Sequence, residues 1–214
     1  MIGIPNGSGL FPHQTVTSLL KLKKPCPCMV QIVERQRTDK ARNYIVKQEL
    51  ESGATHLLFI DDDNPPAENT IERFFQADKD IVCAPIPTRN PNKNGFHDLC
   101  IFNKVVKDDL PFPLYENINK IDLSKGKVFK VDACGMGCTM IKRNVLEKLW
   151  EKYEGSPFAY GELDIDGKKR TMSEDCEFSE RAVNEGFEIW CDTNVIVPHI
   201  CSQKIIQFSD IYLI

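Results

Sequence analysis

Three consecutive aspartates, Asp61, Asp62 and Asp63, follow directly after an apolar run at residues 57–60. A short apolar run predicts a buried strand, and a cluster of charges cannot continue it into the core. The carboxylates are therefore expected at the carboxyl end of that strand, where open α/β sheets bind their ligands. On an extended segment alternate side chains share a face, so Asp61 and Asp63 would converge on one ion while Asp62 points away. Such oxygen ligands suit Mg²⁺ or Mn²⁺, and the competing interpretation is a plain acidic turn.

A second candidate is the acidic start of a predicted helix that runs from about Glu174 to Glu185 and is closed by Gly186. Ser173 can cap this helix, and acids in its first turn complement the helix dipole, which alone would explain these residues. The functional interpretation makes Asp175 a general base, provided that the fold places its carboxylate within reach of a hydroxyl. Spacing alone does not choose between the two interpretations.

His199 follows a predicted strand at residues 195–197, near the end of the sequence. A lone histidine is more often a hydrogen-bonded surface residue than a ligand. It becomes a metal ligand if the fold brings it to Asp63, since imidazole is an acceptable ligand for Mn²⁺.

Basic residues cluster at Arg37, Lys40 and Arg42, around the start of a helix that is predicted from Asp39, as its cap, to about Ser52. In a parallel sheet this helix start lies on the same side as the acidic strand end. A diphosphate bound there would be attracted to the cluster, although most such clusters are solvated helix faces.

A fifth feature is the small-residue segment that contains Asp132, Gly135, Met136 and Gly137. Small residues let backbone N–H groups approach a ligand closely. The alternative is a bulge or a tight turn without a binding role.

The segments that must position these residues alternate between strand and helix over the first 85 residues. Strands are predicted at 2–5, 29–33, 57–60 and 80–84, and helices at 12–23, 39–52 and after Pro65-Pro66. This alternation predicts an α/β fold with a mostly parallel, Rossmann-like central sheet flanked by helices. In the first helix, Val16, Leu19 and Leu20 have the spacing of residues that face a core.

The rest of the sequence is less regular and predicts a small antiparallel part. Its predicted elements are strands at 99–102, 128–131, 139–141, 188–191 and 195–197, a helix at 144–153 capped by Asn144, and a hairpin within 159–173. Asp166-Gly167 is the turn signal of that hairpin. With no repeat and no linker, a single domain over residues 1–214 is expected.

Composition sets the class of protein. The chain of 214 residues is 42% hydrophobic with a formal charge of −4, which predicts a substantial core and no general attraction to nucleic acid. Nine cysteines, an odd number without a secretory signal, favour reduced thiols and a cytoplasmic protein. Their C-x-C and C-x-x-x-C spacings are unlike the usual zinc pattern. No apolar run is long enough to span a bilayer.

Taken in order, these features resemble the GT-A-fold glycosyltransferases, near the large inverting family-2 type. The matching segments extend over nearly the whole chain: Pro5-Asn6, Ala41-Arg42-Asn43, Leu57–Asp63, Gly135-Met136-Gly137, Glu174-Asp175 and His199. The resemblance implies a metal-dependent transfer of a sugar, with inversion, from a UDP- or GDP-linked donor to a hydroxyl of a glycan, lipid-linked or protein acceptor. Residues 1–85 would form the nucleotide-binding half, and 86–214 the acceptor and catalytic half.

Carried over to this sequence, the resemblance gives each candidate a role. Asp61, Asp63 and His199 would hold Mn²⁺ or Mg²⁺, and Asp175 would deprotonate the acceptor. The nucleotide would contact Pro5, Asn6, Arg37, Arg42, Asp61 and Asp62. The donor sugar and the acceptor would contact Asp132, Gly135, Met136, Gly137 and Glu174. The short sequence after the final strand leaves the acceptor site open, or supplied by another domain or protein.

Two other functions stay open at this point. A sugar-phosphate nucleotidyltransferase would normally have a basic, glycine-rich loop after the first strand, but here no Arg or Lys precedes Lys21. The other is a non-catalytic nucleotide-sugar or glycan-binding module, against which the complete set of candidate residues argues. Residues 161–172 are expected either as a lid, with Arg170 or a lysine meeting phosphate, or as an exposed hairpin.

Overall fold

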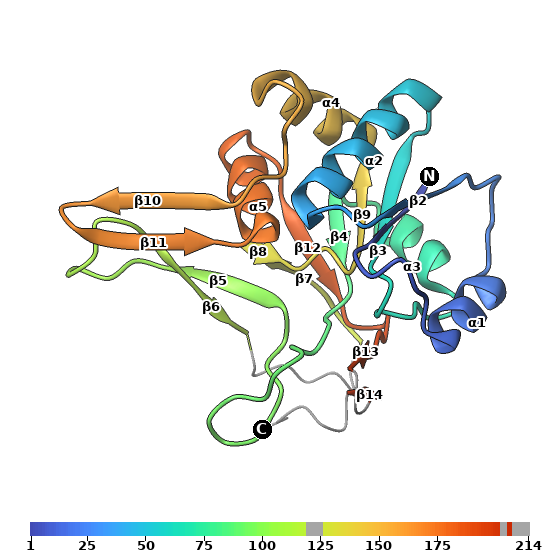
Figure 1. Cartoon of the computed structure of the whole chain (residues 1–214), viewed down its shortest axis with the longest axis horizontal. Coiled ribbons are helices and arrows are strands. Elements are labelled where there is room, and N and C mark those ends of the chain that lie inside the picture. The colour runs from blue at the N-terminus through green and yellow to red at the C-terminus, as the bar shows by residue number, and fades with distance from the viewer. Residues whose placement is uncertain (119–125, 202–204, 207–214) are drawn as a thin grey trace.

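The computed structural model describes residues 1–118, 126–201 and 205–206. Its centre is a seven-stranded mixed sheet with helices on both faces (Figure 1). In spatial order the strands are β2 (Val30–Glu34), β1 (Ile2–Asn6), β3 (His56–Ile60), β9 (Cys138–Lys142), β4 (Ile81–Cys83), β12 (Ile189–Asp192) and β7 (Val128–Val131). The helices are α1 (His13–Lys21), α2 (Thr38–Ser52), α3 (Thr70–Ala77), α4 (Arg143–Lys152) and α5 (Glu174–Asn184).

The expected α/β class is confirmed, but the sheet is mixed. Strands β2, β1, β3, β4 and β12 run in one direction, whereas β9 and β7 run against them. β9 lies between β3 and β4 and pairs antiparallel with both. This strand comes from the second half of the sequence, so the strand-helix alternation of the first half could not reveal it.

β3 separates two hydrophobic cores, because successive side chains of a strand point to opposite faces. Leu57 and Phe59 belong to the core that α2, α4 and α5 cover. Leu58 and Ile60 belong to the core on the other face, next to α1 and α3. All four side chains are buried, so β3 is fixed from both sides up to its last residue.

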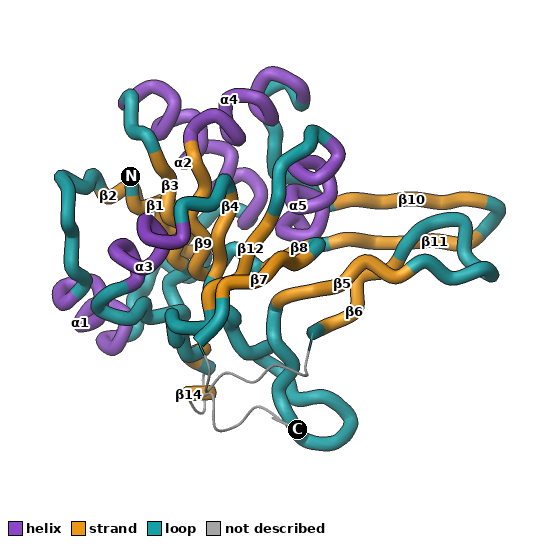
Figure 2. The backbone as a smooth tube through the Cα atoms, turned by 180° about the vertical axis from the view of Figure 1, so that it is seen from behind, coloured by secondary structure: helices purple, strands orange, loops and turns teal. Residues whose placement is uncertain are grey.

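Smaller sheets extend from the main sheet. β5 (Ile101–Val105) pairs with β6 (Leu114–Asn117) and β8 (Ala133–Cys134), β10 (Gly161–Ile165) pairs with β11 (Lys168–Met172), and β13 (His199–Ile200) pairs with β14 (Ile205–Ile206). The β10–β11 hairpin projects away from the main sheet (Figures 1 and 2). Asp166 and Gly167 at its tip have φ values of 55° and 77°, the left-handed pair that the turn signal predicted.

The first helix faces the core differently from the prediction. Leu19 packs against the core, but Val16 is 41% exposed and Leu20 is 81% exposed. The opposite side of α1 points inward, where the Thr15 hydroxyl donates to the carbonyl oxygen of Asp62 at 2.7 Å. The helix therefore contacts the segment after β3 through a polar group, which leaves Val16 and Leu20 outside.

Three further predictions of local structure are wrong. The helix α4 begins before Asn144, with Lys142 at its N-cap and no side-chain cap. Arg37 is the N-cap of α2, and Asp39 lies inside the first turn, where it accepts two hydrogen bonds from Arg37. Residues 195–197 form no strand, because the chain turns directly after β12 and crosses toward β13.

Eight of the cysteines are free thiols: Cys26, Cys28, Cys83, Cys100, Cys134, Cys138, Cys176 and Cys191. Cys134 and Cys138 lie in opposite cores, so their sequence spacing does not make a metal pair. A hydrogen bond with Cys83, together with burial, raises the pKa of the Cys134 thiol, and burial raises that of Cys138, so both stay protonated as small apolar groups. In the described part of the chain no helix combines the length and the apolar character needed to cross a bilayer.

Candidate active site

The three aspartates lie at the carboxyl end of β3, as expected, but they do not extend the strand. The Asp61 amide donates to the Gly137 carbonyl oxygen at 2.9 Å, and the Asn64 amide closes a turn by donating to the Asp61 carbonyl oxygen at 3.0 Å. In this turn the side chains no longer alternate between two faces as they would on a strand. Asp62 therefore does not point away, and all three aspartates line one cavity. Asp61 and Asp63 also do not converge on one point, because Asp61 pairs with Arg42 and Asp63 pairs with His199.

Asp63 meets His199 from the far end of the sequence. The His199 Nε2 lies 3.2 Å from Asp63 Oδ2, and the Ile200 amide of the same strand donates to the Asp63 carbonyl oxygen at 2.8 Å. His199 Nδ1 lies 2.8 Å from the Pro87 carbonyl oxygen, which can only accept. Nδ1 therefore carries a proton, and Nε2 is the nitrogen that faces Asp63.

The charges of this pair support each other. Burial works to raise the pKa of Asp63, but His199 and Arg89 outweigh it and hold that pKa below its usual value. Burial works to lower the pKa of His199, and the hydrogen bond to Asp63 raises it. An ionised carboxylate next to an imidazole is a set of donors that attracts a cation.

Arg89 is a residue that sequence reasoning missed. It follows β4, its side chain is 63% exposed, and its guanidinium pairs with the same Asp63 oxygen that faces His199. The available signal was the position of Arg89 after a strand that runs parallel to β3, since such strands end at the same edge. Within the described residues, no set of three or more His, Cys, Asp or Glu side chains is grouped as a metal site.

Arg42 occupies the centre of a buried charge cluster. Its guanidinium lies 3.0 Å from Asp61, 3.6 Å from Glu174 and 3.5 Å from Asp175, and its side chain is 1% exposed. The ring of Phe59 lies 5.2 Å from the guanidinium carbon, a cation–π distance. Arg42 was expected on the wall of the nucleotide pocket, but it lies behind that wall and joins Asp61 to the start of α5.

The neighbours of Arg42 on α2 explain how it is held. Ala41 packs in the core, and the Asn43 side chain exchanges two hydrogen bonds with the Phe158 backbone, at 2.8 and 2.9 Å. The Phe158 ring stacks on Phe178 with centroids 4.3 Å apart. The three residues 41–43 thus fix the helix to the core on both sides of the arginine.

Asp175 lies in the first turn of α5, and the Ser173 hydroxyl caps that helix as predicted. Burial raises the pKa of Asp175 to about 7; Arg42 opposes this rise, whereas Glu174 and Asp61 add to it. The side chain is 22% exposed, so it is not sealed from solvent. A carboxylate that titrates near neutral pH is suited to accept a proton.

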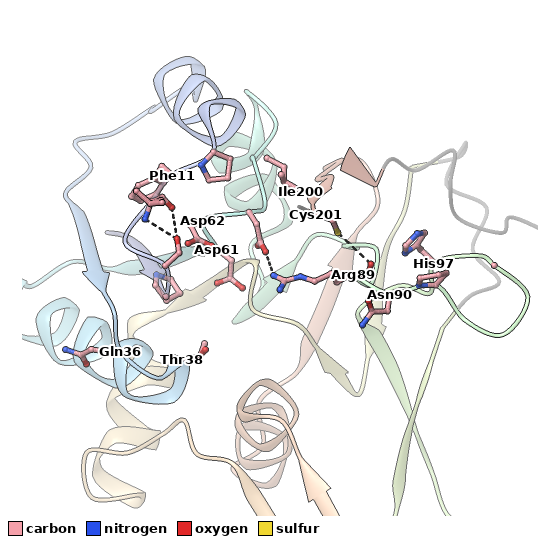
Figure 3. Close-up of a pocket in the computed structure, with 18 residues that line it drawn as sticks. Phe11, Gln36, Thr38, Asp61, Asp62, Arg89, Asn90, His97, Ile200 and Cys201 are labelled. Atoms are coloured by element: carbon pink, nitrogen blue, oxygen red, sulfur yellow. Dashed lines mark hydrogen bonds and ion pairs between the residues drawn. The ribbon is translucent and has the colours of Figure 1, made fainter. Parts of the chain in front are cut away.

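A cavity of about 1320 Å³ opens beside the aspartates. Figure 3 shows Asp61, Asp62 and Arg89 between the loop that carries Phe11 and the loop that carries His97. Of the predicted site, Pro5 and the three aspartates line this cavity. Other wall residues, which sequence reasoning did not select, are Phe11, Gln36, Thr38, Arg89, Asn90 and His97.

The fold is shared with known structures. A197 from STIV matches with a TM-score of 0.59 at 18% identity, over 100% of this chain and 95% of A197. The crystal structure of GalNAc-T7 with UDP, GalNAc and Mn²⁺ matches with a TM-score of 0.56 at 13% identity, over 94% of this chain. The chain corresponds to 43% of the length of that GalNAc-T7 chain. At these identities the likeness shows the fold alone.

Sequence comparison adds no relative. No family model matches the chain, and no curated protein matches it significantly. UDP-glucose pyrophosphorylase from Leishmania major overlaps 67% of the chain with a TM-score of 0.32, which is too low to carry an argument. Further assignment therefore depends on the geometry of the site.

Besides Arg42, two more residues expected to contact the nucleotide, Asn6 and Arg37, lie outside the cavity wall. Asn6 is fully buried, and its side-chain oxygen accepts from the Gly9 amide at 2.8 Å and from Ser8, so it shapes the loop that borders the cavity. Arg37 is exposed, pairs with Asp39 and lies 5.3 Å from the Tyr160 ring.

Within the segment from Asp132 to Gly137, some residues anchor the segment to the rest of the fold and others lie near the site. Asp132 accepts a hydrogen bond from the Lys104 amide at 2.7 Å and so ties this segment to β5, whereas Met136 is buried in the core. The two glycines are the part nearest the site. A side chain at Gly135 would lie 3.8 Å from Asp175, and one at Gly137 would collide with Asn64.

Proposed function

We propose that this chain is a GT-A-type glycosyltransferase that moves a sugar, with inversion, from a nucleoside-diphosphate sugar to a hydroxyl acceptor. The observation that carries the proposal is the Asp63–His199 contact of 3.2 Å beside a cavity of about 1320 Å³. This volume exceeds the range of ordinary small-ligand pockets and suits a nucleotide joined to a sugar. The fold shared with GalNAc-T7, crystallised with UDP, GalNAc and Mn²⁺, supports the same assignment.

The residues present fit a divalent cation. Asp63 and His199 offer an oxygen and a nitrogen ligand, and the hydrogen bond from His199 to the Pro87 carbonyl is the outer contact that orients a metal-binding imidazole. Arg89 on the same carboxylate indicates that this position attracts positive charge. Asp61, which is paired with Arg42, would contact the ribose or the ion from the cavity side. A bound Mn²⁺ or Mg²⁺ would stabilise negative charge on the leaving diphosphate.

Arg89 is the residue that we assign to the diphosphate. A planar guanidinium binds phosphate oxygens through two parallel hydrogen bonds. Its side chain is 63% exposed and lines the cavity, so it is free to exchange the Asp63 carboxylate for a donor phosphate. Asp62 also lines the cavity, where burial raises the pKa of its carboxyl to about 6.

Asp175 would take the proton from the acceptor hydroxyl. The acceptor oxygen would then form a bond to the anomeric carbon while the bond from that carbon to the diphosphate oxygen breaks, which inverts the configuration. Arg42 would act as a positioning residue that holds Asp61 and Asp175 at fixed places. In this proposal residues 1–85 bind most of the nucleotide, and residues 86–214 supply Arg89, the base Asp175 and His199.

The test combines binding and turnover. Thermal unfolding is measured with UDP, GDP and their sugar conjugates, each with and without Mn²⁺. At a donor concentration of roughly 100 Kd we expect the Tm to rise by about 5–10 °C, because a ligand that binds only the folded state stabilises it by mass action. If no nucleotide or nucleotide sugar raises the Tm with any divalent ion, the proposal fails.

Donor hydrolysis then separates an enzyme from a binding module. The variant Asp175→Asn should keep the thermal shift and lose turnover by about hundredfold or more. The matched control is Glu177→Gln in the same helix turn, where the carboxylate pairs with Arg181 at 2.9 Å. Since burial raises the pKa of Asp175 to about 7, turnover should rise as the pH passes through that value and the base loses its proton. Equal turnover of Asp175→Asn and wild type would remove Asp175 from the reaction.

A further inference from the structure

The N-terminal part of the chain differs in charge from the rest. Residues 1–33 contain three lysines, Lys21, Lys23 and Lys24, and no Asp or Glu, in a chain whose formal net charge is −4. A charge asymmetry of this kind points to an acidic partner. The three lysines follow one another at the end of α1, so their charges are concentrated in one place.

Large apolar side chains are exposed in the same N-terminal part of the chain. Leu20 is 81% exposed, Leu10 is 74% exposed and Val16 is 41% exposed. Val16 and Leu20 are four residues apart on α1 and therefore lie on the same face of the helix. Thr15, on another side of the helix, is fully buried, so the side of α1 that carries Val16 and Leu20 points outward.

The contacts made by the lysines leave their charges available. Lys24 Nζ donates to the Leu19 carbonyl oxygen at 3.3 Å, and the Lys23 backbone amide donates to the Glu68 carbonyl oxygen at 2.8 Å. No ion pair among residues 1–118, 126–201 and 205–206 involves any of the three lysines. This backbone contact places the acidic residue Glu68 beside the lysines.

We infer that α1 and residues 21–24 dock on an anionic lipid bilayer. Exposed leucine and valine side chains would enter the boundary between headgroups and acyl chains, and the lysines would contact the anionic headgroups. Nucleic acid fits this surface less well. Residues 1–33 contain no arginine, and their only Phe, Tyr or Trp is Phe11, which is partly buried, so stacking groups for bases are lacking.

The position of α1 would bring a docked bilayer close to the cavity. Figure 1 shows α1 at one end of the molecule and the β10–β11 hairpin at the other. Leu10, which belongs to the exposed apolar group, also lines the large cavity together with Phe11 and Pro12. A docked bilayer would therefore lie beside the cavity. If the proposed function holds, this arrangement presents the site to a lipid-linked acceptor.

Vesicle sedimentation tests the docking without reference to activity. The protein is mixed with phosphatidylcholine vesicles that contain or lack phosphatidylglycerol, and the bound fraction is measured. We expect binding that needs phosphatidylglycerol and weakens with salt. The triple variant Lys21→Gln, Lys23→Gln, Lys24→Gln should bind about hundredfold more weakly, at roughly fivefold per lysine. Leu20→Glu should weaken binding by about tenfold or more.

The matched control is Val106→Glu, because Val106 is 77% exposed and lies outside the N-terminal part. Its vesicle binding should equal that of wild type, and all variants should keep the wild-type Tm. Failure of the wild type to sediment with anionic vesicles would overturn the inference. So would an equal loss in Val106→Glu, unchanged binding of the lysine variant, or binding to duplex DNA without binding to vesicles.

Discussion

At the scale of single residues, Arg42 makes a large contribution to the free energy of unfolding. The variant Arg42→Met would leave Asp61, Glu174 and Asp175 buried without their cation. Removing one partner of a buried ion pair costs about 3–5 kcal/mol. We expect the free energy of unfolding, measured by chemical denaturation at about pH 8, to fall by this amount.

The same variant has a pH signature that a simple packing defect lacks. Arg42 stabilises the ionised carboxylates, and burial raises the pKa of Asp175 to about 7 and also raises that of Asp61. The stabilisation from Arg42 is therefore complete only above about pH 7 and decreases as the pH falls. The exposed Lys40→Met on the same helix should change stability by less than about 0.5 kcal/mol. A loss in Arg42→Met that is the same at acid and alkaline pH would contradict this account.

At the scale of elements, the glycine turn before β9 controls how that strand enters the sheet. A Cβ at Gly137 would collide with the Asn64 side chain and lie 2.9 Å from Ile86 Cδ1. Asn64 is itself held, since its Nδ2 donates to the Pro198 carbonyl oxygen at 3.2 Å. We expect Gly137→Ala to destabilise the protein by about 1–3 kcal/mol in thermal or chemical denaturation.

Gly7→Ala provides the control for this substitution. No heavy atom lies within 4 Å of a Cβ built at Gly7, so the added methyl group meets open space. Its stability should stay close to that of wild type. If both variants lose the same amount, the collision at Gly137 is not the cause.

Elements governed by local signals could be predicted from the sequence. The apolar run before the aspartates formed β3, Ser173 capped α5, and Asp166-Gly167 turned the hairpin. Each depends on neighbours within a few residues. The prediction of the buried face of α1 was wrong, because the apolar spacing does not show which face meets the sheet. The hydrogen bond from Thr15 to Asp62 sets that orientation.

At the scale of the whole molecule, the site is assembled by contacts between distant parts of the chain. The sequence named Asp63 and His199 as candidates, but only the fold brings them to 3.2 Å. It likewise places Arg89 on Asp63, which no local pattern predicted. Arg42 was selected for its charge, and its burial between two groups of acids follows from the packing of α2 on the sheet.

We expect a bound donor to protect the loop that carries Arg89 but not the β10–β11 hairpin. The cavity wall includes the loop with Arg89, and that loop continues to the exposed Lys93. The β10–β11 hairpin was a possible lid, but Arg170 is buried there and pairs with Glu180 at 2.9 Å, so it is not available to a phosphate.

Trypsin cleavage distinguishes these two segments. With a UDP-sugar and Mn²⁺, we expect slower cleavage after Arg89 and Lys93, because a bound donor holds the loop at the cavity wall closed to the protease. Cleavage after Lys168 and Lys169, which are exposed in the hairpin, should keep its rate. The rates are read from the masses of the fragments over time, with Mn²⁺ alone as the control. Protection of the hairpin with no protection of the loop would restore the lid and place the donor beside the hairpin.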